Sequence, residues 1–342
     1  MAELSSDIVI VGAGVLGLCV AVELAGRGRD VCVIDPGGAN ASSVAAGMIA
    51  PAFESLSAEG DPDRAALFRD AAALWPDTAR RLGIALDTTP AIWRGAEAPA
   101  VAARLRALGF DVHQHADRVE APGDVRVDPA LALAAMAARL PRPVLSARAL
   151  DGRATDQGWA LTTTASPVAA RHLVLATGAA AALPGLPPDV AALIDAIEPI
   201  AGQIGRALHP LGPQGVRRGP DGYVVTTRDH WLIGATMVAG SRDLTPDPDQ
   251  SRRLEAVAER LLDQTLDSPV SWTGGIRGST ADGLPLAGPA GVPGLHFALA
   301  PRRNGWLLGP LVGRIVADGI EGRPPAARAA ALDPLRFSRP AG

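Results

Sequence analysis

Three glycines and an aspartate near the start of the chain have the types and spacing that bind the phosphates of a dinucleotide. Gly12, Gly14 and Gly17 form a Gly-x-Gly-x-x-Gly motif directly after an apolar stretch that ends at Val11. Such glycines allow a tight turn and close approach of the backbone to a pyrophosphate, whose charge the next helix stabilises. Asp35 ends the following apolar run, where a carboxylate can accept from ribose hydroxyls. A tight strand-to-helix turn without a ligand is the alternative interpretation, and the combined features favour a dinucleotide.

The rest of the chain favours FAD over NAD. A second Gly-x-Gly-x-x-Gly motif is absent, so the two-nucleotide layout of flavoprotein reductases that use NAD(P)H is missing. Small and hydroxyl-bearing residues at 41–51 suit a segment that lies flat under a phosphate and an isoalloxazine ring. Residues 303–306 open the last apolar helix, whose N-terminus would stabilise an anionic reduced flavin.

The charge composition excludes several classes of function. The chain contains no lysine, which excludes pyridoxal-phosphate enzymes and Walker-A nucleotide sites because both require one. The chain has 32 basic and 36 acidic residues, and no run of like charge predicts a nucleic-acid or anionic-membrane surface. We therefore expect a small molecule as the partner.

Cysteine and histidine spacing predicts no metal or redox site. Cys19 and Cys32 fall in the predicted first helix and second strand, and we interpret both as buried small hydrophobes. His113 and His115 could lie on one strand face, but without a third ligand they indicate an exposed edge. The apolar stretch 8–26 is interrupted by glycines and carries a glutamate, so we expect no membrane span. From cysteines that we interpret as reduced and from the lack of a targeting signal, we expect a cytoplasmic location.

Periodicity predicts the elements that position these residues, and the first of them form a βαβ unit. Predicted strands cover residues 7–11, 31–34, 144–150, 159–164, 172–176, 200–207, 223–227 and 231–236. Predicted helices cover residues 15–25, 64–82, 98–108, 129–139, 249–266 and 304–319. Stretches rich in Pro and Gly at 88–95 and 121–124 indicate connections.

Further motifs follow one another along nearly the whole chain. They are GAGVLG, SSVAAGM, Val127-Asp128-Pro129, HLVLATG, Glu198-Pro199 to Gly202-Gln203, Tyr223 through GATM, GGIR to DGLPLAG, and RRNGWLLGP. In this order and spacing the chain resembles the glycine oxidases, within the FAD-dependent D-amino-acid oxidase family. The resemblance implies an α/β fold (α+β overall), with a Rossmann-like FAD-binding domain of the glutathione-reductase type at 1–82, 124–196 and 277–342. An antiparallel-sheet substrate domain would comprise 83–123 and 197–276.

The same resemblance assigns the residues that line the cofactor. They are Gly12, Gly14, Val15, Leu16, Gly17, Asp35, Pro36, Ser42, Ser43, Ala46, Gly47, Met48, Ala149, Gly178, Pro301, Arg302, Asn304, Gly305, Trp306 and Leu307. Both cysteines lie far from the C-terminal position that sarcosine oxidases use for covalent attachment of the flavin. We therefore expect non-covalent FAD and no metal.

Four further residues match the substrate site of such enzymes. Arg277 and Arg303 would clamp the substrate carboxylate, since the planar guanidinium binds carboxylates through two hydrogen bonds. Tyr223, the single tyrosine, would bind the same carboxylate, and Met237 would form a wall of the pocket. Solvated surface charges and core packing are the alternatives for these residue types.

The resemblance implies oxidative deamination of a small amino acid, with glycine expected first. A hydride passes from Cα to flavin N5, the imine hydrolyses to a 2-oxo acid and ammonia, and O2 reoxidises the flavin to give H2O2. The family also suggests a role in forming the thiazole of thiamine, and its members are commonly homo-oligomers. The alternatives are a D-amino-acid or N-methylamino-acid (sarcosine- or proline-type) oxidase or dehydrogenase, and a non-catalytic flavin-binding subunit of a larger dehydrogenase.

Two segments depart from the family pattern. Relatives usually have Gly-His before the C-terminal flavin loop, whereas this chain has Ala300-Pro301-Arg302. Arg302 beside Arg303 leaves two candidates for the residue that faces the substrate. After Arg277, Gly-Ser replaces the usual Pro-Gly. These changes bear on the substrate and the electron acceptor more than on the cofactor.

Overall fold

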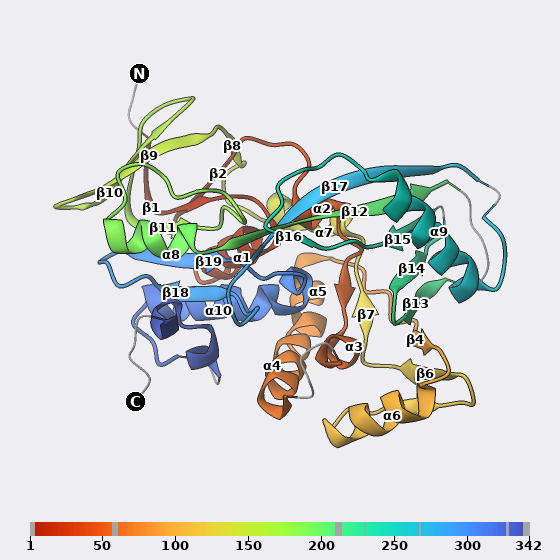
Figure 1. Cartoon of the computed structure of the whole chain (residues 1–342). Helices are drawn as coiled ribbons and strands as arrows, with labels where there is room; N and C mark the ends of the chain where they lie inside the picture. The colour runs from red at the N-terminus through yellow and green to blue at the C-terminus, as the bar shows by residue number, and fades with distance from the viewer. Residues whose placement is uncertain are drawn as a thin grey trace. The chain divides into compact units, whose positions relative to one another are not determined.

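The chain forms two compact units, each assembled from separate stretches of sequence (Figure 1). The computed structural model describes residues 4–56, 61–208, 214–228, 230–266, 268–325 and 328–337. Unit 1 comprises Met1–Ser43, Ala132–Pro199 and Arg277–Gly342. Unit 2 comprises Val44–Leu131 and Ile200–Ile276.

These bounds differ from those of the predicted domains, because residues 44–82 and 124–131 belong to unit 2 and residues 197–199 belong to unit 1. Phe53 and Ala65 share a hydrophobic core with Trp93, Leu105 and Val225 of that unit. The difference therefore arises from long-range packing, which local sequence patterns do not report. Which unit binds the cofactor and which the substrate stays a prediction.

A mostly parallel sheet forms the centre of unit 1 and confirms the predicted βαβ start. Its strands lie in the order β18-β19-β11-β1-β2-β8, with β10 pairing with β11 and β9 pairing with β10. Their bounds are β1 Leu4–Val11, β2 Val31–Asp35, β8 Leu145–Ser146, β9 Ala149–Thr155, β10 Gly158–Thr163, β11 Val168–Leu175, β18 Leu286–Pro289 and β19 Leu295–Leu299. β1 runs parallel to β2 and β11, and β11 runs parallel to β19. The carboxyl ends of these strands, where such sheets bind ligands, therefore share one edge.

Two helices of unit 1 pack closely because glycines face a neighbouring backbone. A Cβ on Gly309 of α10 (Gly305–Ile320) would lie 2.8 Å from Sγ of Cys19 in α1 (Val15–Gly26). A Cβ on Gly313 would lie 2.7 Å from the Cys19 carbonyl oxygen. Cys19 and Cys32 are 2 % and 3 % exposed, which confirms both as buried small residues. The other helices assigned to this unit are α2 (Ala41–Val44), α8 (Pro188–Asp195), η1 (Ala329–Leu332) and η2 (Pro334–Phe337).

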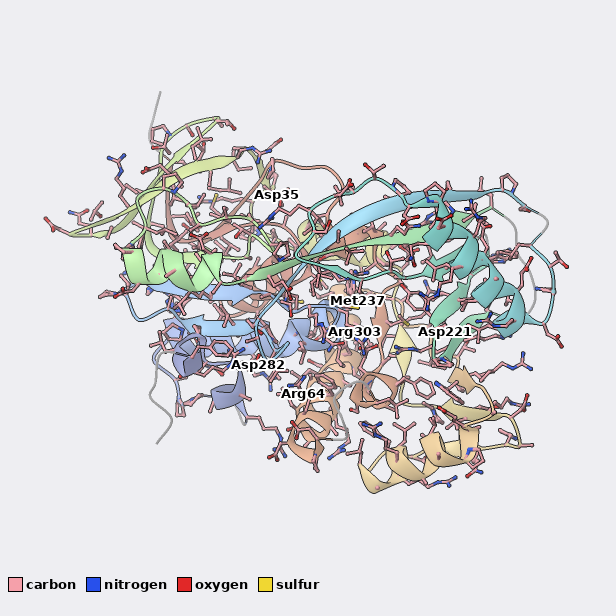
Figure 2. The ribbon with its side chains drawn as sticks, in the orientation of Figure 1. Asp35, Arg64, Asp221, Met237, Asp282 and Arg303 are labelled. Carbon is pink, nitrogen blue, oxygen red and sulfur yellow. The ribbon has the colours of Figure 1, made fainter. Side chains whose placement is uncertain are left out.

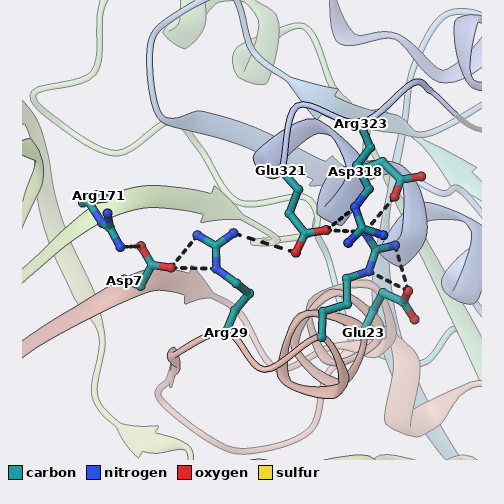
Figure 3. Close-up of polar contacts among 8 residues, drawn as sticks. Asp7, Glu23, Arg29, Arg171, Asp318, Glu321 and Arg323 are labelled. Atoms are coloured by element: carbon teal, nitrogen blue, oxygen red, sulfur yellow. Dashed lines mark hydrogen bonds and ion pairs between the residues drawn. The ribbon is translucent and has the colours of Figure 1, made fainter.

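The C-terminal ends of α1 and α10 are joined by ion pairs (Figure 3). Nη1 of Arg27 lies 2.7 Å from Oδ1 of Asp318 and 2.8 Å from Oε2 of Glu321. Nη2 of the same guanidinium lies 2.9 Å from Oε1 of Glu23. Arg323 also pairs with Glu321, at 2.8 Å. Arg27 therefore ties the two helices together at the ends opposite their N-termini.

A second sheet forms the centre of unit 2, in the order β16-β12-β15-β14-β13-β4-β6-β5 with β17 pairing with β12. The described pairs are antiparallel except for β13 with β4, which is parallel. Bounds are β4 Ala91–Arg94, β5 His113–Gln114, β6 Arg118–Ala121, β12 Glu198–Ala207, β13 Gly215–Gly219, β14 Gly222–Thr226, β15 Trp231–Gly234, β16 Val238–Ala239 and β17 Val270–Ser279. A separate pair, β3 (Met48–Ile49) with β7 (Val125–Arg126), is also antiparallel. The antiparallel character predicted for the second domain is thus present.

Alternating side chains of β14 and β15 build a hydrophobic core on each face of this sheet. Val224 and Ile233 pack with Leu254 of α9 (Pro248–Leu262), whereas Val225 and Leu232 pack in the other core. The other helices are α3 (Pro51–Ser55), α4 (Pro62–Ala72), α5 (Trp75–Leu82) and α6 (Ala98–Ala107), and α7 (Pro129–Ala138) spans the boundary of the units.

Three predicted elements were wrong in detail. The helix predicted over 64–82 is two helices, because Pro76 in the first turn of α5 cannot continue the hydrogen bonding of α4. The predicted connection 88–95 contains β4, in which Ala91 and Trp93 are buried. The helix predicted over 249–266 ends at Leu262, since Asp263 has a left-handed φ of 58°. Within the described part of the chain, no helix is long and apolar enough to cross a membrane.

Candidate active site

The turn between β1 and α1 has the shape that its glycines predicted. Gly12 has a φ of +112°, and a Cβ there would lie 2.3 Å from the carbonyl oxygen of Ala176. A Cβ on Gly17 would lie 2.0 Å from the carbonyl oxygen of Gly12. At Gly14, by contrast, the nearest atom among the described residues is Oγ of Ser42, at 3.3 Å from a Cβ. Two glycines are therefore required by the turn itself, and the third keeps space open beside the helix start.

Oxygen atoms already face the amide groups at this helix start. Oδ2 of Asp35 accepts from N of Ala13 at 2.7 Å, and Oγ of Ser42 accepts from N of Val15 at 3.0 Å. Figure 2 marks Asp35 at the end of β2. No acidic residue occupies the first turn of α1. The open space at Gly14 and the positive helix end fit the phosphates of a dinucleotide.

The two neighbouring serines of α2 differ in their contacts. Ser43 Oγ donates to O of Asn40 at 3.0 Å and accepts from N of Asn40 at 3.0 Å. Oδ1 of Asn40 accepts from N of Ser42 and N of Ser43. Ser43 therefore helps cap its own short helix, whereas the hydroxyl of Ser42 reaches the glycine turn.

The loop that leads into α10 is strained. Ala300 and Arg302 have φ values of 56° and 51°, and neither is a glycine. Such left-handed residues cost about 1–3 kcal/mol each and cluster at functional sites. N of Arg302 donates to O of Gly278 at 2.8 Å, and Ser279 forms an isolated bridge with Pro301. These bonds hold the loop against the segment that carries Arg277.

The first turn of α10 lies against the first turn of α1. A Cβ on Gly305 would lie 3.1 Å from Cγ1 of Val15, and Nε1 of Trp306 donates to O of Ser42 at 3.2 Å. Asn304 is 8 % exposed, and its Oδ1 is buried with no hydrogen-bond partner among the described residues. An unsatisfied buried oxygen at this position fits a ligand that carries N–H donors, as the isoalloxazine ring of FAD does.

Arg277, Arg302 and Arg303 are all partly buried, and Figure 2 marks Arg303 at the start of α10. A Cβ on Gly278 would lie 2.9 Å from Cγ2 of Ile197 and 3.1 Å from O of Gly178. The backbone next to Arg277, at Gly278, and next to Arg303, at Arg302, is therefore held by packing and hydrogen bonding, as a binding site for a small anion requires.

Several other predicted cofactor residues lie elsewhere in unit 1. Leu16 and Leu307 are buried in α1 and α10, and Pro36 is exposed after β2. Ala149 begins β9 and pairs with Thr163 of β10. The roles of these residues toward the cofactor stay predictions.

Residues 46–48, which are predicted to line the cofactor, are held by backbone contacts with other residues of unit 2. Gly47 has a φ of +72°, and a Cβ there would lie 2.1 Å from O of Val127. N of Val127 donates to O of Gly47 at 3.0 Å, and Met48 pairs with Arg126. Ala46 is 3 % exposed. The Val-Asp-Pro motif thus contacts the segment predicted to run along the flavin.

Asp124 is a buried acidic residue that the sequence analysis placed in a connection. Its Oδ1 and Oδ2 accept from N of Ala52 and N of Phe53, at 2.8 and 3.0 Å. Burial raises the pKa of Asp124 to about 7, although these bonds and the nearby Arg218 oppose the shift. Asp124 caps α3, which follows directly on segment 46–48. A carboxylate in a turn is usually solvated, so its type alone gave no signal of this role.

Tyr223 and Met237 both lie in unit 2. Tyr223 is in β14, and Met237, which follows β15 and is marked in Figure 2, is 38 % exposed. Gln203 anchors the segment before Met237, because its backbone N–H donates to Oγ1 of Thr236 at 2.9 Å. Its side chain donates to Oγ of Ser251 and accepts from N of Asp247.

The histidine pair at 113 and 115 lies on an exposed edge, as predicted. Both side chains are exposed, and Nε2 of His115 lies 3.3 Å from Oε1 of Glu120. Among the described residues, no group of three or more His, Cys, Asp or Glu side chains could hold a metal ion.

Comparisons with known proteins give a consistent result. The family model described as FAD dependent oxidoreductase (DAO) matches residues 7–319. A glycine oxidase of Geobacillus kaustophilus is 32 % identical over 92 % of this chain and 93 % of its own length. The bifunctional protein ThiO/ThiG of Trichormus variabilis is 31 % identical over 93 % of this chain and 53 % of its own length. The crystal structure of glycine oxidase from G. kaustophilus superposes with a TM-score of 0.82 at 28 % identity, covering 98 % of this chain and 99 % of the other.

Proposed function

This chain belongs to the FAD dependent oxidoreductase family, and from that premise we propose that it catalyses the oxidative deamination of a small amino acid, with glycine preferred. The observation that carries the proposal is the similarity to a glycine oxidase over 92 % of the chain. The strained loop before α10 supports it, because that loop carries Arg302 and Arg303 and is hydrogen-bonded to Gly278, the residue next to Arg277.

The chain's own residues would hold FAD at the paired helix starts of unit 1. The pyrophosphate would lie in the open space beside Gly14, where the N-terminal end of α1 stabilises its charge, and Asp35 keeps further lone pairs for ribose hydroxyls. Oδ1 of Asn304 would accept from the isoalloxazine ring. Bound FAD would supply the acceptor, at N5, for a hydride from the substrate Cα, and O2 would be the final electron acceptor, reduced to H2O2.

The substrate carboxylate would be bound by Arg277, Arg303 and Tyr223. Guanidinium pairs fix the orientation of a carboxylate as well as its charge, which sets the direction of the Cα–H bond. Met237 would limit the volume beside Cα and so favour a small side chain. The product imine would hydrolyse to a 2-oxo acid and ammonia.

We extend the proposal to the setting of the reaction. The similarity to a ThiO/ThiG protein supports a role in supplying the imine for the thiazole of thiamine. We propose a cytoplasmic homo-oligomer with non-covalently bound FAD. Release of intact FAD by acid would support non-covalent binding, and flavin that stays with the denatured chain would contradict it.

The test is anaerobic reduction of the FAD-loaded protein by a panel of amino acids. We expect glycine to bleach the flavin absorbance fastest, with readmitted O2 restoring it and producing H2O2. Faster reduction by sarcosine, D-alanine or D-proline would move the substrate to the N-methylamino-acid or D-amino-acid class. Restoration by an artificial acceptor but not by O2 would indicate a dehydrogenase. A flavin that no amino acid bleaches would overturn the proposal in favour of a flavin-binding subunit.

A further inference from the structure

Gly234 faces the ring of the chain's single tyrosine. It is the last residue of β15, and it pairs directly with Tyr223 of β14. A Cβ on Gly234 would lie 2.2 Å from both Cζ and the hydroxyl oxygen of Tyr223, and 2.7 Å from its Cε2. The phenol therefore lies across the bare backbone of Gly234, with its hydroxyl end directly over this residue.

The backbone itself does not require glycine at this position. The φ of Gly234 lies outside the left-handed range, and the three atoms nearest to its missing Cβ all belong to the tyrosine ring. At Gly222, by contrast, a Cβ would lie 2.7 Å from a backbone oxygen. Glycine at 234 thus makes room for the Tyr223 side chain alone. A larger residue at 234 would displace that side chain at small cost to the fold.

The base of the ring is held by its surroundings. Tyr223 is partly buried and packs against the core that contains Val225 and Leu232. A methyl group at position 234 would therefore displace mainly the far end of the ring, which carries the hydroxyl. A displacement of this kind changes the direction of a hydrogen bond, and hydrogen bonds weaken steeply with poor geometry.

We propose that Gly234 is a positioning residue that sets the place of the Tyr223 hydroxyl and thereby the affinity for the substrate carboxylate. The inference rests on the proposed function, in which that hydroxyl binds the carboxylate. Gly234 is the first residue of the Gly-Ala-Thr-Met stretch. Its proposed role depends on the position of the tyrosine side chain and not on a backbone turn.

The test is a double-mutant cycle in the FAD-loaded protein, with Gly234→Ala, Tyr223→Phe and the combination. Two affinities are measured: KM for glycine, and the Kd of acetate as a non-reacting carboxylate that perturbs the flavin spectrum. We expect each single variant to weaken both by about tenfold, as for loss of a hydrogen bond to a charged group. The combination should be no weaker than Tyr223→Phe alone, because a displaced ring without a hydroxyl has nothing further to lose.

A second measurement follows the tyrosine without turnover. The chain has one tyrosine, so incorporation of 3-fluorotyrosine gives one 19F resonance that reports Tyr223. Gly234→Ala should shift that resonance while leaving FAD affinity unchanged. The matched control is Gly205→Ala in β12, where a Cβ would meet side-chain atoms of Val270 and Trp272 at 2.7 and 2.9 Å. It should change neither the resonance nor the Kd of acetate.

The outcomes separate the two proposals. If Tyr223→Phe weakens acetate while Gly234→Ala leaves the Kd and the resonance unchanged, the positioning role is wrong and the proposed function stands. Additive losses in the combination would mean that Gly234 acts independently of the tyrosine, which also overturns the inference. A wild-type flavin that no amino acid reduces would overturn the proposed function, and the inference with it.

Discussion

Every permanently positive side chain of this protein is an arginine, since the sequence contains no lysine. A guanidinium binds a carboxylate through a planar fork, whereas an ammonium acts as a compact point charge. A small amino acid offers few groups for recognition apart from its carboxylate and amine. Arginine contacts should therefore determine how such a substrate is oriented, and partly buried arginines are the residues to test.

Replacing Arg277 tests the proposed carboxylate clamp. Removing one partner of a desolvated charged pair costs about 2–5 kcal/mol, so Arg277→Ala should weaken amino-acid binding by at least roughly tenfold. Arg277→Lys should recover part of the loss, because it keeps the charge without the fork. The measurements are KM for glycine and the Kd of acetate in the FAD-loaded variants.

The control for Arg277 is a substrate analogue without a carboxylate, whose weak binding should barely change. FAD should also remain bound in both variants. Wild-type kinetics in Arg277→Ala, or loss of FAD in its place, would mean that Arg277 is structural. Arg302 and Arg303 would then be the remaining candidates for the clamp.

Substitution of Gly14 tests the binding of the cofactor separately from the folding of the turn. A side chain there would meet the Ser42 hydroxyl and otherwise open space among the described residues, so Gly14→Val should leave the apoprotein folded. It should nevertheless abolish FAD binding, because the side chain would occupy the place of the pyrophosphate. Equilibrium titration with FAD and circular dichroism of the apoprotein measure the two effects. Unchanged FAD affinity would contradict the proposed cofactor site.

Local residue patterns were sufficient to predict the glycine turn, because its spacing and positive φ depend on neighbouring residues. The different contacts of Ser42 and Ser43 were not predictable. Both are adjacent hydroxyls in one short helix, and only the placement of that helix decides which of them reaches N of Val15. Asp124 was missed for a related reason, since the two backbone N–H groups that donate to its carboxylate are distant in sequence.

At the scale of elements, α1 and α10 are fixed at both ends. Their N-terminal turns meet through Val15 and Gly305, and their C-terminal ends meet through Arg27. A helix N-terminus stabilises an anion that lies along the helix axis, so the orientation of both helices matters for the proposed cofactor site. The ion pairs of Arg27 at the C-terminal ends help to maintain that orientation. Hydrogen bonds to Asp318, Glu321 and Glu23 also raise the pKa of Arg27 against its burial.

Arg27→Met should destabilise the protein substantially. The carboxylates of Asp318 and Glu321 have 12 % exposed side chains each and would lose a partner, and breaking such a pair costs about 3–5 kcal/mol when fully buried and less when part-exposed. The matched control is Arg323→Met, which removes a 58 % exposed arginine from the same Glu321 and should cost at most about 1 kcal/mol. Urea unfolding of the two apoproteins makes the comparison, and equal losses would show that the network has no role in joining the helices.

Element prediction succeeded where a segment was apolar over its whole length. The strand, turn and helix from β1 to β2 were placed within a few residues, because β1, α1 and β2 are each strongly apolar. The same reasoning missed β4, whose buried Ala91 and Trp93 stand between Pro- and Gly-rich segments that resemble a loop. A short strand of this kind is stabilised by its partners β6 and β13, which sequence windows do not include.

At the scale of the whole molecule, the boundaries between the units were the least predictable feature. Residues 44–82 begin within the predicted cofactor-binding segment, yet they contribute Phe53 and Ala65 to the core of unit 2. Composition does not change at that boundary. Only the pairing of β3 with β7 and the packing around Phe53 assign these residues to the second unit.

The core of unit 1 also contains two histidines that neither the proposed reaction nor the proposed cofactor site uses. His172 of β11 and His296 of β19 have ring centroids 5.6 Å apart, and Nδ1 of each is buried with no hydrogen-bond partner among the described residues. Burial, together with a smaller contribution from His172, lowers the pKa of His296 to about 4. The pKa of His172 is also lowered by burial, against the attraction of Asp7.

These histidines predict a loss of stability in mild acid. In the unfolded chain a histidine binds a proton near pH 6.5, whereas folded His296 stays neutral down to about pH 4. Protons therefore favour the unfolded state as the pH falls between these values, and the free energy of unfolding should decrease by roughly 3 kcal/mol at most from this residue.

Urea unfolding of the apoprotein at pH 7, 6 and 5 should show a smaller decrease in His296→Gln than in the wild type, because glutamine takes up no proton. His113→Gln, at an exposed position in β5, is the matched control and should keep the wild-type pH dependence. The same decrease in His296→Gln and the wild type would mean that other groups cause the acid sensitivity.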